Sequence, residues 1–199
     1  MGLILDISSY NGVIDWQEVF TKNDISKVIL RSTTKNGNLD TRFIQNLNGI
    51  LENNSGCVID TYKFSYAKNY GQASVEAKRI LRTLAENGIT HFVGRIWLDI
   101  EDVGGQEWTT AQCEEVISAY EDVLDRYSDI ALGIYANYHY VKNILPKWFV
   151  KSVWLARWTA AESYGDISPF KAAMWQYTNK GKVAGIPTAV DLSRYVESK

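Results

Sequence analysis

Two carboxylates separated by one residue, Asp99 and Glu101, follow a short apolar run. On a β-strand, residues i and i+2 lie on the same face with Cα atoms about 6.6 Å apart. Carboxyl groups this close disfavour each other's ionisation, so one tends to keep its proton nearer to neutral pH. A protonated carboxyl beside an ionised one suits glycoside hydrolysis, because one protonates the leaving oxygen and the other faces the developing positive charge. The alternative is a pair of exposed loop acids, and the apolar lead-in Ile96–Leu98 argues against it.

Short apolar runs alternate with amphipathic segments along the chain. The strands and helices that they predict must position the acids. Eight runs are bounded by turn residues and rich in β-branched or aromatic residues, as buried strands are: Leu3–Ile7, Lys27–Ser32, Val58–Phe64, Arg95–Ile100, Ile130–Ala136, Val153–Ala156, Ala173–Tyr177 and Ala189–Leu192. Five segments have helical spacing: Trp16–Lys22, Phe43–Asn53, 71–87, 110–127 and Tyr138–Leu145. Thr109 with Gln112 resembles a capping box, and Gly88 suits a helix C-terminus.

The order of these elements predicts the fold class. Alternating strands and helices indicate an α/β protein with a parallel sheet and right-handed crossovers. Eight strands suggest closure into an irregular TIM-like barrel. Residues 157–172 and 178–188 show no convincing helix, so five strand–helix units are followed by three strands, a (β/α)₅β₃ pattern. The length of 199 residues fits a single catalytic domain over 1–199.

In such barrels the site lies at the carboxyl ends of the strands. Asp6 lies near the end of the first predicted strand, Asp99 and Glu101 end the fourth, and Asp191 lies on the eighth. The first and eighth strands are neighbours in a closed barrel, and the fourth faces them. We therefore predict that four carboxylates point toward one mouth as candidate catalytic residues.

Aromatic residues make up 13% of the chain, with 7 Trp and 12 Tyr. Trp and Tyr can stack on sugar rings as well as fill a core. For any single aromatic residue, core packing is the simpler interpretation. Because many of them fall at strand ends, however, we predict that an aromatic group binds substrate: Tyr62, Phe64, Trp97, Tyr135, Trp154, Trp158 and Trp175.

Other features argue against several classes. The net charge of −2 is unlike a nucleic-acid surface. No stretch approaches the roughly 18 apolar residues of a membrane span, and Met1–Asp6 lacks the basic region of a signal peptide. Cys57 and Cys113 are predicted to be free thiols. His91 is expected at a strand start and His139 in solvent, so we predict no metal and no cofactor.

Five segments taken together resemble glycoside hydrolase family 25, the Chalaropsis-type lysozymes or N-acetylmuramidases: Asp6–Trp16, Trp97–Asp102, Gly133–Asn137, Trp175–Thr178 and Val190–Leu192. The likeness runs from Leu3 to about Tyr195. It implies a flattened (β/α)₅β₃ barrel and hydrolysis of the β-1,4 bond between N-acetylmuramic acid and N-acetylglucosamine in bacterial peptidoglycan.

The resemblance also implies roles for the acids. Glu101 is similar to the family's general acid/base, Asp99 to its helper, and Asp6 and Asp191 to two further cleft acids. We expect a retaining, substrate-assisted reaction in which the 2-acetamido oxygen attacks the anomeric carbon and Asp99 orients that amide. Direct attack, or activation of water, by Asp191 or Asp6 stays open.

The chain departs from the family pattern at several positions. Lys63 stands where the family often has His, and Trp158 where Tyr is common. Asp60 occupies a position that is usually small, and a lone buried Asp would be costly. We therefore predict that Arg31, where most members carry Lys, pairs with Asp60.

Two other functions remain to be weighed against a lysozyme. One is an inactive module that binds cell-wall glycan, which retention of four acids disfavours. The other is a hydrolase resembling a chitinase or endo-N-acetylglucosaminidase, but Trp97 stands where the motif of family 18 requires Asp. We expect a monomer that acts on the cell wall, either extracellular or released by a phage, with no nucleic-acid or membrane partner.

Overall fold

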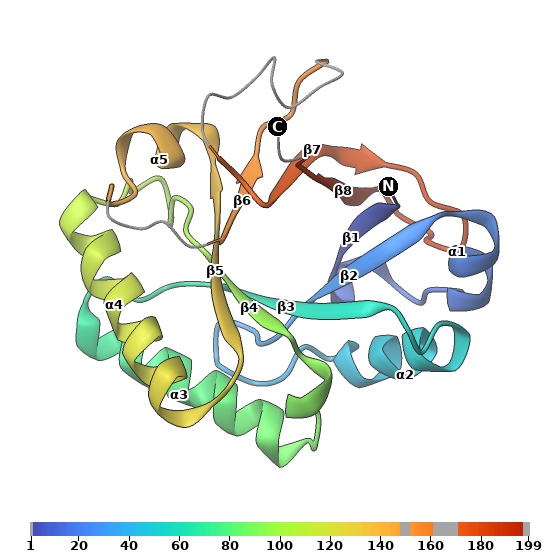
Figure 1. Ribbon diagram of the computed structural model, residues 1–199, viewed down its shortest axis with the longest axis horizontal. Coiled ribbons are helices and arrows are strands. Elements are labelled where there is room, and N and C mark those ends of the chain that lie inside the picture. Colours follow the sequence, from blue (N-terminus) through green and yellow to red (C-terminus); the bar gives the residue numbers. More distant parts are fainter. Residues whose placement is uncertain (1, 148–151, 161–170, 197–199) are drawn as a thin grey trace.

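Eight strands form a closed barrel in chain order (Figure 1). The computed structural model describes residues 2–147, 152–160 and 171–196. The strands are β1 (Leu3–Ile7), β2 (Ile25–Arg31), β3 (Val58–Phe64), β4 (Arg95–Asp99), β5 (Ala131–Asn137), β6 (Ser152–Ala156), β7 (Met174–Gly181) and β8 (Val190–Tyr195). The predicted α/β barrel is confirmed, and all eight predicted runs overlap these strands.

A helix follows each of the first five strands. These are α1 (Trp16–Lys22), α2 (Phe43–Asn53), α3 (Tyr70–Glu86), α4 (Thr110–Tyr127) and α5 (Tyr138–Asn143), with short 3₁₀ turns at Ser9–Asn11 and Thr90–Phe92. His91 therefore lies in a turn before β4 and not at a strand start. In the parts of the chain that the structure describes after β6, no helix occurs, which agrees with the (β/α)₅β₃ pattern.

The expectation of an all-parallel sheet is wrong at one strand. β8 pairs antiparallel with both β7 and β1. Parallel neighbours need a crossover of about a dozen residues or more, usually a helix. Only residues 182–189 separate β7 from β8, so the chain turns back on itself. As a result the start of β8, and not its end, lies beside the end of β1, where Asp191 faces Asp6 in register.

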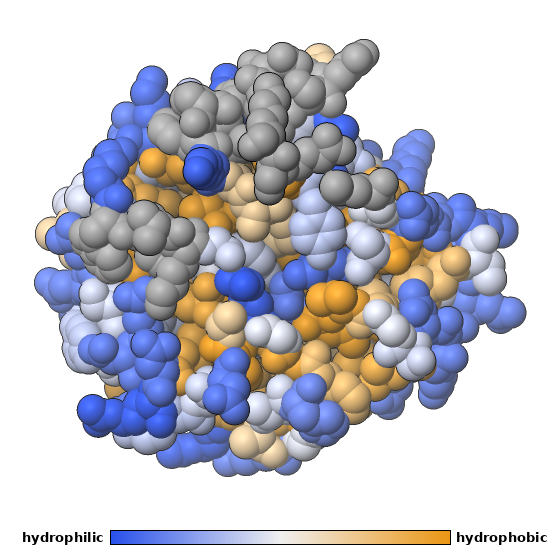
Figure 2. Space-filling view, viewed as in Figure 1, coloured by the Kyte–Doolittle hydropathy of each residue, from blue (hydrophilic) through white to orange (hydrophobic). Residues whose placement is uncertain are grey.

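The helices bury one face each against the outside of the barrel. α4 begins with the predicted capping box, in which Thr109 and Gln112 bond reciprocally, and its apolar face includes the free and buried Cys113. Asn69 caps α3, and Gly88 follows it at φ +68°, a conformation that favours glycine. Figure 2 shows the result on one face: hydrophilic residues lie mostly around the edge, over the helices, and hydrophobic ones lie further in.

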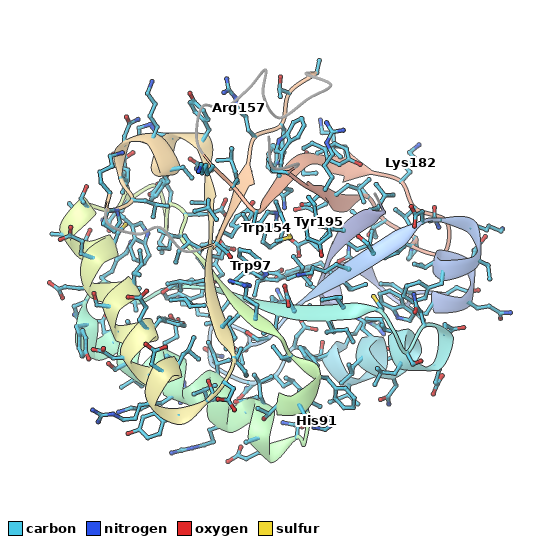
Figure 3. The ribbon with its side chains drawn as sticks, in the orientation of Figure 1. His91, Trp97, Trp154, Arg157, Lys182 and Tyr195 are labelled. Atoms are coloured by element: carbon cyan, nitrogen blue, oxygen red, sulfur yellow. The ribbon has the colours of Figure 1, made fainter. Side chains whose placement is uncertain are left out.

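A second apolar cluster fills the inside of the barrel. It contains Ile4, Ile29, Trp97, Tyr135, Trp154, Ala156 and Met174. Figure 3 shows Trp97 and Trp154 in the middle of the ring of strands, where their rings meet edge to face at 5.8 Å between centroids. No helix among the described residues is long and apolar enough to cross a membrane.

The predicted pair between Arg31 and Asp60 is wrong, although both side chains belong to the inner face of the barrel. Asp60 lies deeper and accepts hydrogen bonds from Lys27 Nζ at 2.6 Å and from Trp97 Nε1 at 3.0 Å. Arg31 lies at the end of β2 and binds Asp40, with 2.7 Å from its Nε to Oδ2. Lys27, the actual partner of Asp60, stands four residues before Arg31 on β2, and inward side chains at different positions along a strand occupy different layers of the barrel.

We predict that Asp60→Ala lowers the free energy of unfolding by about 3–5 kcal/mol, because the buried Lys27 ammonium loses its carboxylate. Chemical denaturation followed by tryptophan fluorescence measures this loss. The double variant Asp60→Ala with Lys27→Met is expected to recover most of it. Lys22→Ala, which breaks an exposed pair with Glu18, is the control and should leave the midpoint nearly unchanged. An equal loss in the single and double variants would contradict the ion-pair interpretation.

Candidate active site

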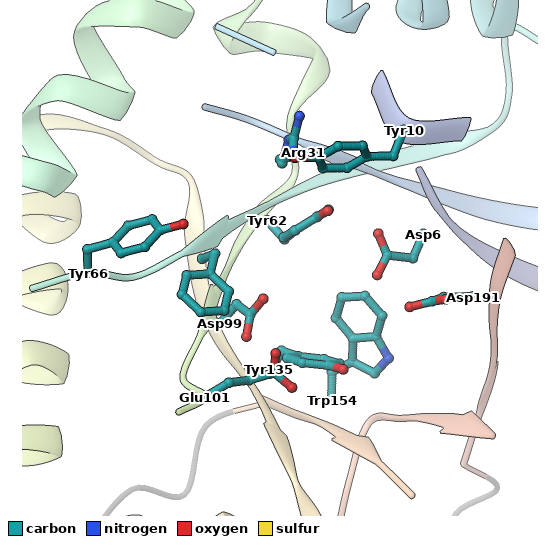
Figure 4. A pocket seen from close by; sticks show the side chains of 11 residues that line it. Asp6, Tyr10, Arg31, Tyr62, Tyr66, Asp99, Glu101, Tyr135, Trp154 and Asp191 are labelled. Atoms are coloured by element: carbon teal, nitrogen blue, oxygen red, sulfur yellow. The ribbon is translucent and has the colours of Figure 1, made fainter. Parts of the chain in front are cut away.

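A cavity of about 340 Å³ opens at the end of the barrel where β1 to β6 terminate and β8 begins. Figure 4 shows its wall from close by. The lining residues are Asp6, Tyr10, Arg31, Tyr62, Phe64, Tyr66, Asp99, Glu101, Tyr135, Trp154 and Asp191. The structure thus brings together all four acids that were predicted at the strand ends.

The four carboxylates reach the cavity from three strands. Asp6 on β1 and Asp191 on β8 are register partners across the antiparallel pair that closes the barrel. Asp99 is the last residue of β4, and Glu101 lies two residues further on. The backbone of Glu101 is held in place, since its carbonyl oxygen accepts a hydrogen bond from the buried Trp108 indole at 2.7 Å. The acids face one another across the mouth of the barrel (Figure 4).

Burial raises the pKa of every one of these acids, and repulsion by neighbouring carboxylates adds to the shift at Asp6, Asp99 and Glu101. The pKa of Asp6 lies well above its usual value because of burial, followed by the charges of Asp191 and Glu101, and Arg31 offsets part of this. Burial also raises the pKa of Asp99 strongly, with Glu101 and Asp6 adding to the effect. The pKa of Glu101 is raised by burial and by Asp191, and that of Asp191 by burial. The group therefore holds protons at a pH where ordinary carboxyls have lost them.

The predicted aromatic residues divide into three groups. Tyr62, Phe64, Tyr135 and Trp154 line the cavity. Trp97 and Trp175 do not: the Trp97 indole N–H donates to Asp60 deeper inside the barrel, and Trp175 donates its indole N–H to the Arg157 carbonyl at 2.8 Å.

Trp158 is a third case. It is 55% exposed and lies outside the cavity lining, and its indole N–H donates to Gln176 Oε1 at 3.0 Å. For Trp97, the alternation of side chains along a strand predicts that the ring faces the inside of the barrel. It does not predict how deep the ring lies, and that depth keeps Trp97 out of the cavity lining.

Three lining residues were missed as site residues: Tyr10, Arg31 and Tyr66. Tyr10 is 81% exposed and covers the Arg31 guanidinium, whose central carbon lies 4.8 Å from the ring centroid. Each of the three lies at or just after the end of one of the first three strands. The rule that pointed to Asp6 and Tyr62 could therefore have found them as well.

A buried polar network supports the wall that Tyr66 forms. Glu76 on α3 accepts hydrogen bonds from Ser65 Oγ at 2.7 Å, the Tyr66 backbone N–H at 3.2 Å and the Tyr120 hydroxyl at 2.9 Å. Lys63, which stands where the family often has His, points away from the cavity toward this network, with its Nζ 3.7 Å from Glu76 Oε1. This substitution therefore alters the support of the site and not its surface.

Comparison with known proteins gives a consistent result. The model of glycosyl hydrolases family 25 matches residues 5–186. No curated relative matches the chain at a significant level. A solved family 25 glycosyl hydrolase from Bacillus anthracis superposes with a TM-score of 0.80 at 18% identity, covering 100% of this chain and 90% of that one.

Two further solved structures are longer than this chain. The CTP1L endolysin is 25% identical with a TM-score of 0.74, covering 99% of this chain and 67% of its own. The modular autolysin LytC from Streptococcus pneumoniae, solved with a synthetic peptidoglycan ligand, is 21% identical with a TM-score of 0.76. The match covers 96% of this chain and 46% of LytC, so this chain spans about half of that autolysin.

The raised pKa values predict how stability depends on pH. A carboxyl whose pKa is higher in the folded than in the unfolded chain stabilises the fold below the unfolded pKa and loses that contribution as pH rises through the folded value. We expect the free energy of unfolding to fall as pH rises from the ordinary carboxyl range near 4 toward neutrality.

Denaturant titrations across this pH range measure the slope, which Asp99→Asn should reduce. Glu52→Gln, an exposed change on α2, is the matched control. A slope that is unaffected by Asp99→Asn would contradict the assignment to the cleft.

Proposed function

Because this chain belongs to glycosyl hydrolases family 25, we propose that it is a lysozyme that cuts the β-1,4 bond between N-acetylmuramic acid and N-acetylglucosamine in bacterial peptidoglycan. The observation that carries the proposal is the group of four acids with raised pKa on one aromatic-walled cavity. The autolysin LytC, which was solved with a peptidoglycan ligand, has a related fold and supports the same substrate class.

Glu101 is proposed as the general acid and base. Its pKa is raised by burial and by Asp191, as an acid needs in order to retain a proton near neutral pH. The indole of Trp108 fixes the Glu101 backbone from outside the cavity. Glu101 would protonate the glycosidic oxygen as the bond breaks, and would then take a proton from the water that completes hydrolysis.

Asp99 is proposed to orient the 2-acetamido group of the substrate. Its Oδ1 is buried and accepts no hydrogen bond from any described residue, although the side chain lines the cavity. A buried polar oxygen without a partner is costly, so a donor from the substrate would be favoured there. The acetamide N–H is such a donor. Held in this way, the amide oxygen can attack the anomeric carbon, which makes the reaction substrate-assisted and retaining.

Asp6 and Asp191 are proposed to face the positive charge that develops on the sugar ring. Both lie on the opposite side of the cavity from Asp99 and Glu101 (Figure 4). Direct attack by one of them is the alternative mechanism. The Gln176 amide lies within 3.2 Å of Asp191 Oδ2 and 3.5 Å of Asp6 Oδ2. Because those oxygens already share a donor, we favour a supporting electrostatic role for the pair.

The aromatic wall is proposed to bind the sugar rings. Tyr62, Phe64, Tyr135 and Trp154 surround the acids, and Tyr10 presents an exposed ring at the rim. Such rings can stack on the apolar faces of sugars while polar groups position the hydroxyls. We propose that the protein works on the cell wall as a monomer, because an open cleft can reach a polymer without a second copy.

Product analysis tests the proposed bond. Digested peptidoglycan is reduced with borohydride and hydrolysed, and the reduced amino sugar is identified. We expect reduced muramic acid, because hydrolysis of the bond from N-acetylmuramic acid to N-acetylglucosamine frees the anomeric carbon of the muramic acid as the new reducing end. Reduced glucosamine would overturn the assignment in favour of an endo-N-acetylglucosaminidase, and wall binding without any new reducing end would indicate an inactive module.

Glu101→Gln should remove most of the activity while leaving the fold and wall binding intact. The amide cannot supply the proton, and general acid–base catalysis is worth about 10²–10⁴-fold. Initial rates in a wall-turbidity assay measure the loss, and circular dichroism and a wall pull-down check the fold and binding. Glu107→Gln, an exposed change on the same loop, is the matched control. A rate near that of the wild type for Glu101→Gln would remove Glu101 from the role.

A further inference from the structure

Gln176 on β7 is fully buried behind the cavity and is absent from its lining. Its side chain makes hydrogen bonds to four residues. Oε1 accepts from the Tyr135 hydroxyl at 3.0 Å and from the Trp158 indole at 3.0 Å. Nε2 donates to Asp191 Oδ2 at 3.2 Å and lies at the outer limit of a hydrogen bond from Asp6 Oδ2, at 3.5 Å. One amide therefore connects the acid pair to an exposed tryptophan.

The chemistry of these partners allows only one orientation of the amide. An indole N–H can donate but never accept, so the group that faces Trp158 must be the amide oxygen. The amide nitrogen then faces the two carboxylates, to which it can donate both protons. The reversed orientation would place the amide nitrogen against the indole N–H and the amide oxygen against two carboxylates, losing the bonds to Trp158, Asp191 and Asp6. Only the Tyr135 hydroxyl, which can accept as well as donate, could keep a bond.

We propose that Gln176 is a positioning residue that holds Asp6 and Asp191 as a pair of acceptors facing the substrate and helps to keep them ionised. This inference rests on the proposed function and deepens it. Gln176 touches no substrate atom, since it is buried and lies outside the lining. It acts on the reaction through the geometry and protonation of the two acids.

The electrostatic setting explains why such a donor is needed. Burial raises the pKa of both acids, and their charges oppose each other across one strand pair. The other titratable or charged groups around the pair are Arg31 on β2, Tyr62 on β3, Asp99 and Glu101 at β4, and Tyr135 on β5. The guanidinium of Arg157, which follows β6, lies over the ring of Tyr138, with 4.0 Å from its central carbon to the ring centroid. Arg31 is the cation that lowers the pKa of Asp6, and it is bound to Asp40. A neutral donor beside Asp191 favours its charged form without adding a second cation.

Gln176→Glu tests the proposal with little change of shape. A glutamate can still accept from Tyr135 and Trp158, but it replaces the two amide donors with an acid. The pKa values of Asp6 and Asp191 should rise, and the acid limb of the kcat/KM profile should move up by about one pH unit. We expect kcat to fall by about 10²-fold with KM little changed, because the acids lose their position and not the sugar contacts.

Carbon-13 NMR of the aspartate carboxyls follows the same titrations without relying on activity, with Asp191→Asn to assign the signals. Gln17→Glu, which adds the same charge at an exposed site on α1, is the control and should leave both readouts unchanged. If Gln176→Glu is folded and titrates as the wild type does, the inference fails.

Trp158→Phe provides a second variant if Gln176→Glu does not fold. It keeps an aromatic ring at the exposed position but removes the N–H that fixes the amide. We expect a shift of the acid limb in the same direction but smaller, because the amide can then rotate. An unchanged profile in Trp158→Phe would overturn the proposal in that case. Failure of the proposed function can be told apart from failure of this inference. In the first case the wild type would release no reducing ends of muramic acid. The carboxyl titrations do not depend on activity and would still show whether Gln176 affects the two acids.

Discussion

The crowding of four carboxyl groups at one end of a barrel is the constraint on which the rest of the structure depends. Such groups repel one another and lose hydration when buried, so each must be compensated or hold a proton. Arg31 supplies positive charge on one side of the cavity, and the Gln176 amide supplies donors on another. The raised pKa values are the remaining cost, and they give the group the mixed protonation that acid catalysis uses.

The direction of the last strand makes this arrangement possible. Because β8 runs antiparallel to β1, Asp191 near its start meets Asp6 near the end of β1. A parallel β8 would have placed an early residue at the opposite end of the barrel. The short connection after β7 therefore decides at which end of the barrel the fourth acid lies.

Buried polar groups behind the cavity hold its walls in place. Trp108 anchors the carbonyl of Glu101, and Glu76 anchors the turn that carries Tyr66. Inside the barrel, Lys27 and Trp97 share the carboxylate of Asp60. Each of these contacts gives a polar group a partner, and the contacts of Trp108 and Glu76 hold backbone atoms of Glu101 and Tyr66 beside the cavity. The walls of the cavity are thus held by residues that lie outside its lining.

Periodicity and turn residues were enough to predict the eight strands, the five helices and the four acids at the barrel mouth. These features follow from local patterns, because burial of one strand face or helix face leaves a regular mark on the sequence. The five spaced motifs also indicated the family, which the match over residues 5–186 bears out. Local patterns were not enough for partners: Arg31 was assigned to Asp60, and Trp97 and Trp175 were expected at the cleft.

The sequence by itself determined which residues could do the chemistry and roughly where along each strand they stand. The tertiary structure alone decided which of them meet. Depth within the barrel separates Arg31 from Asp60, strand direction brings Asp191 to Asp6, and the amide of Gln176 bonds to residues from four different segments. These contacts depend on closure of the barrel, which brings together residues that are far apart in the chain. A local sequence pattern does not indicate which distant side chains will lie in the same layer of the barrel.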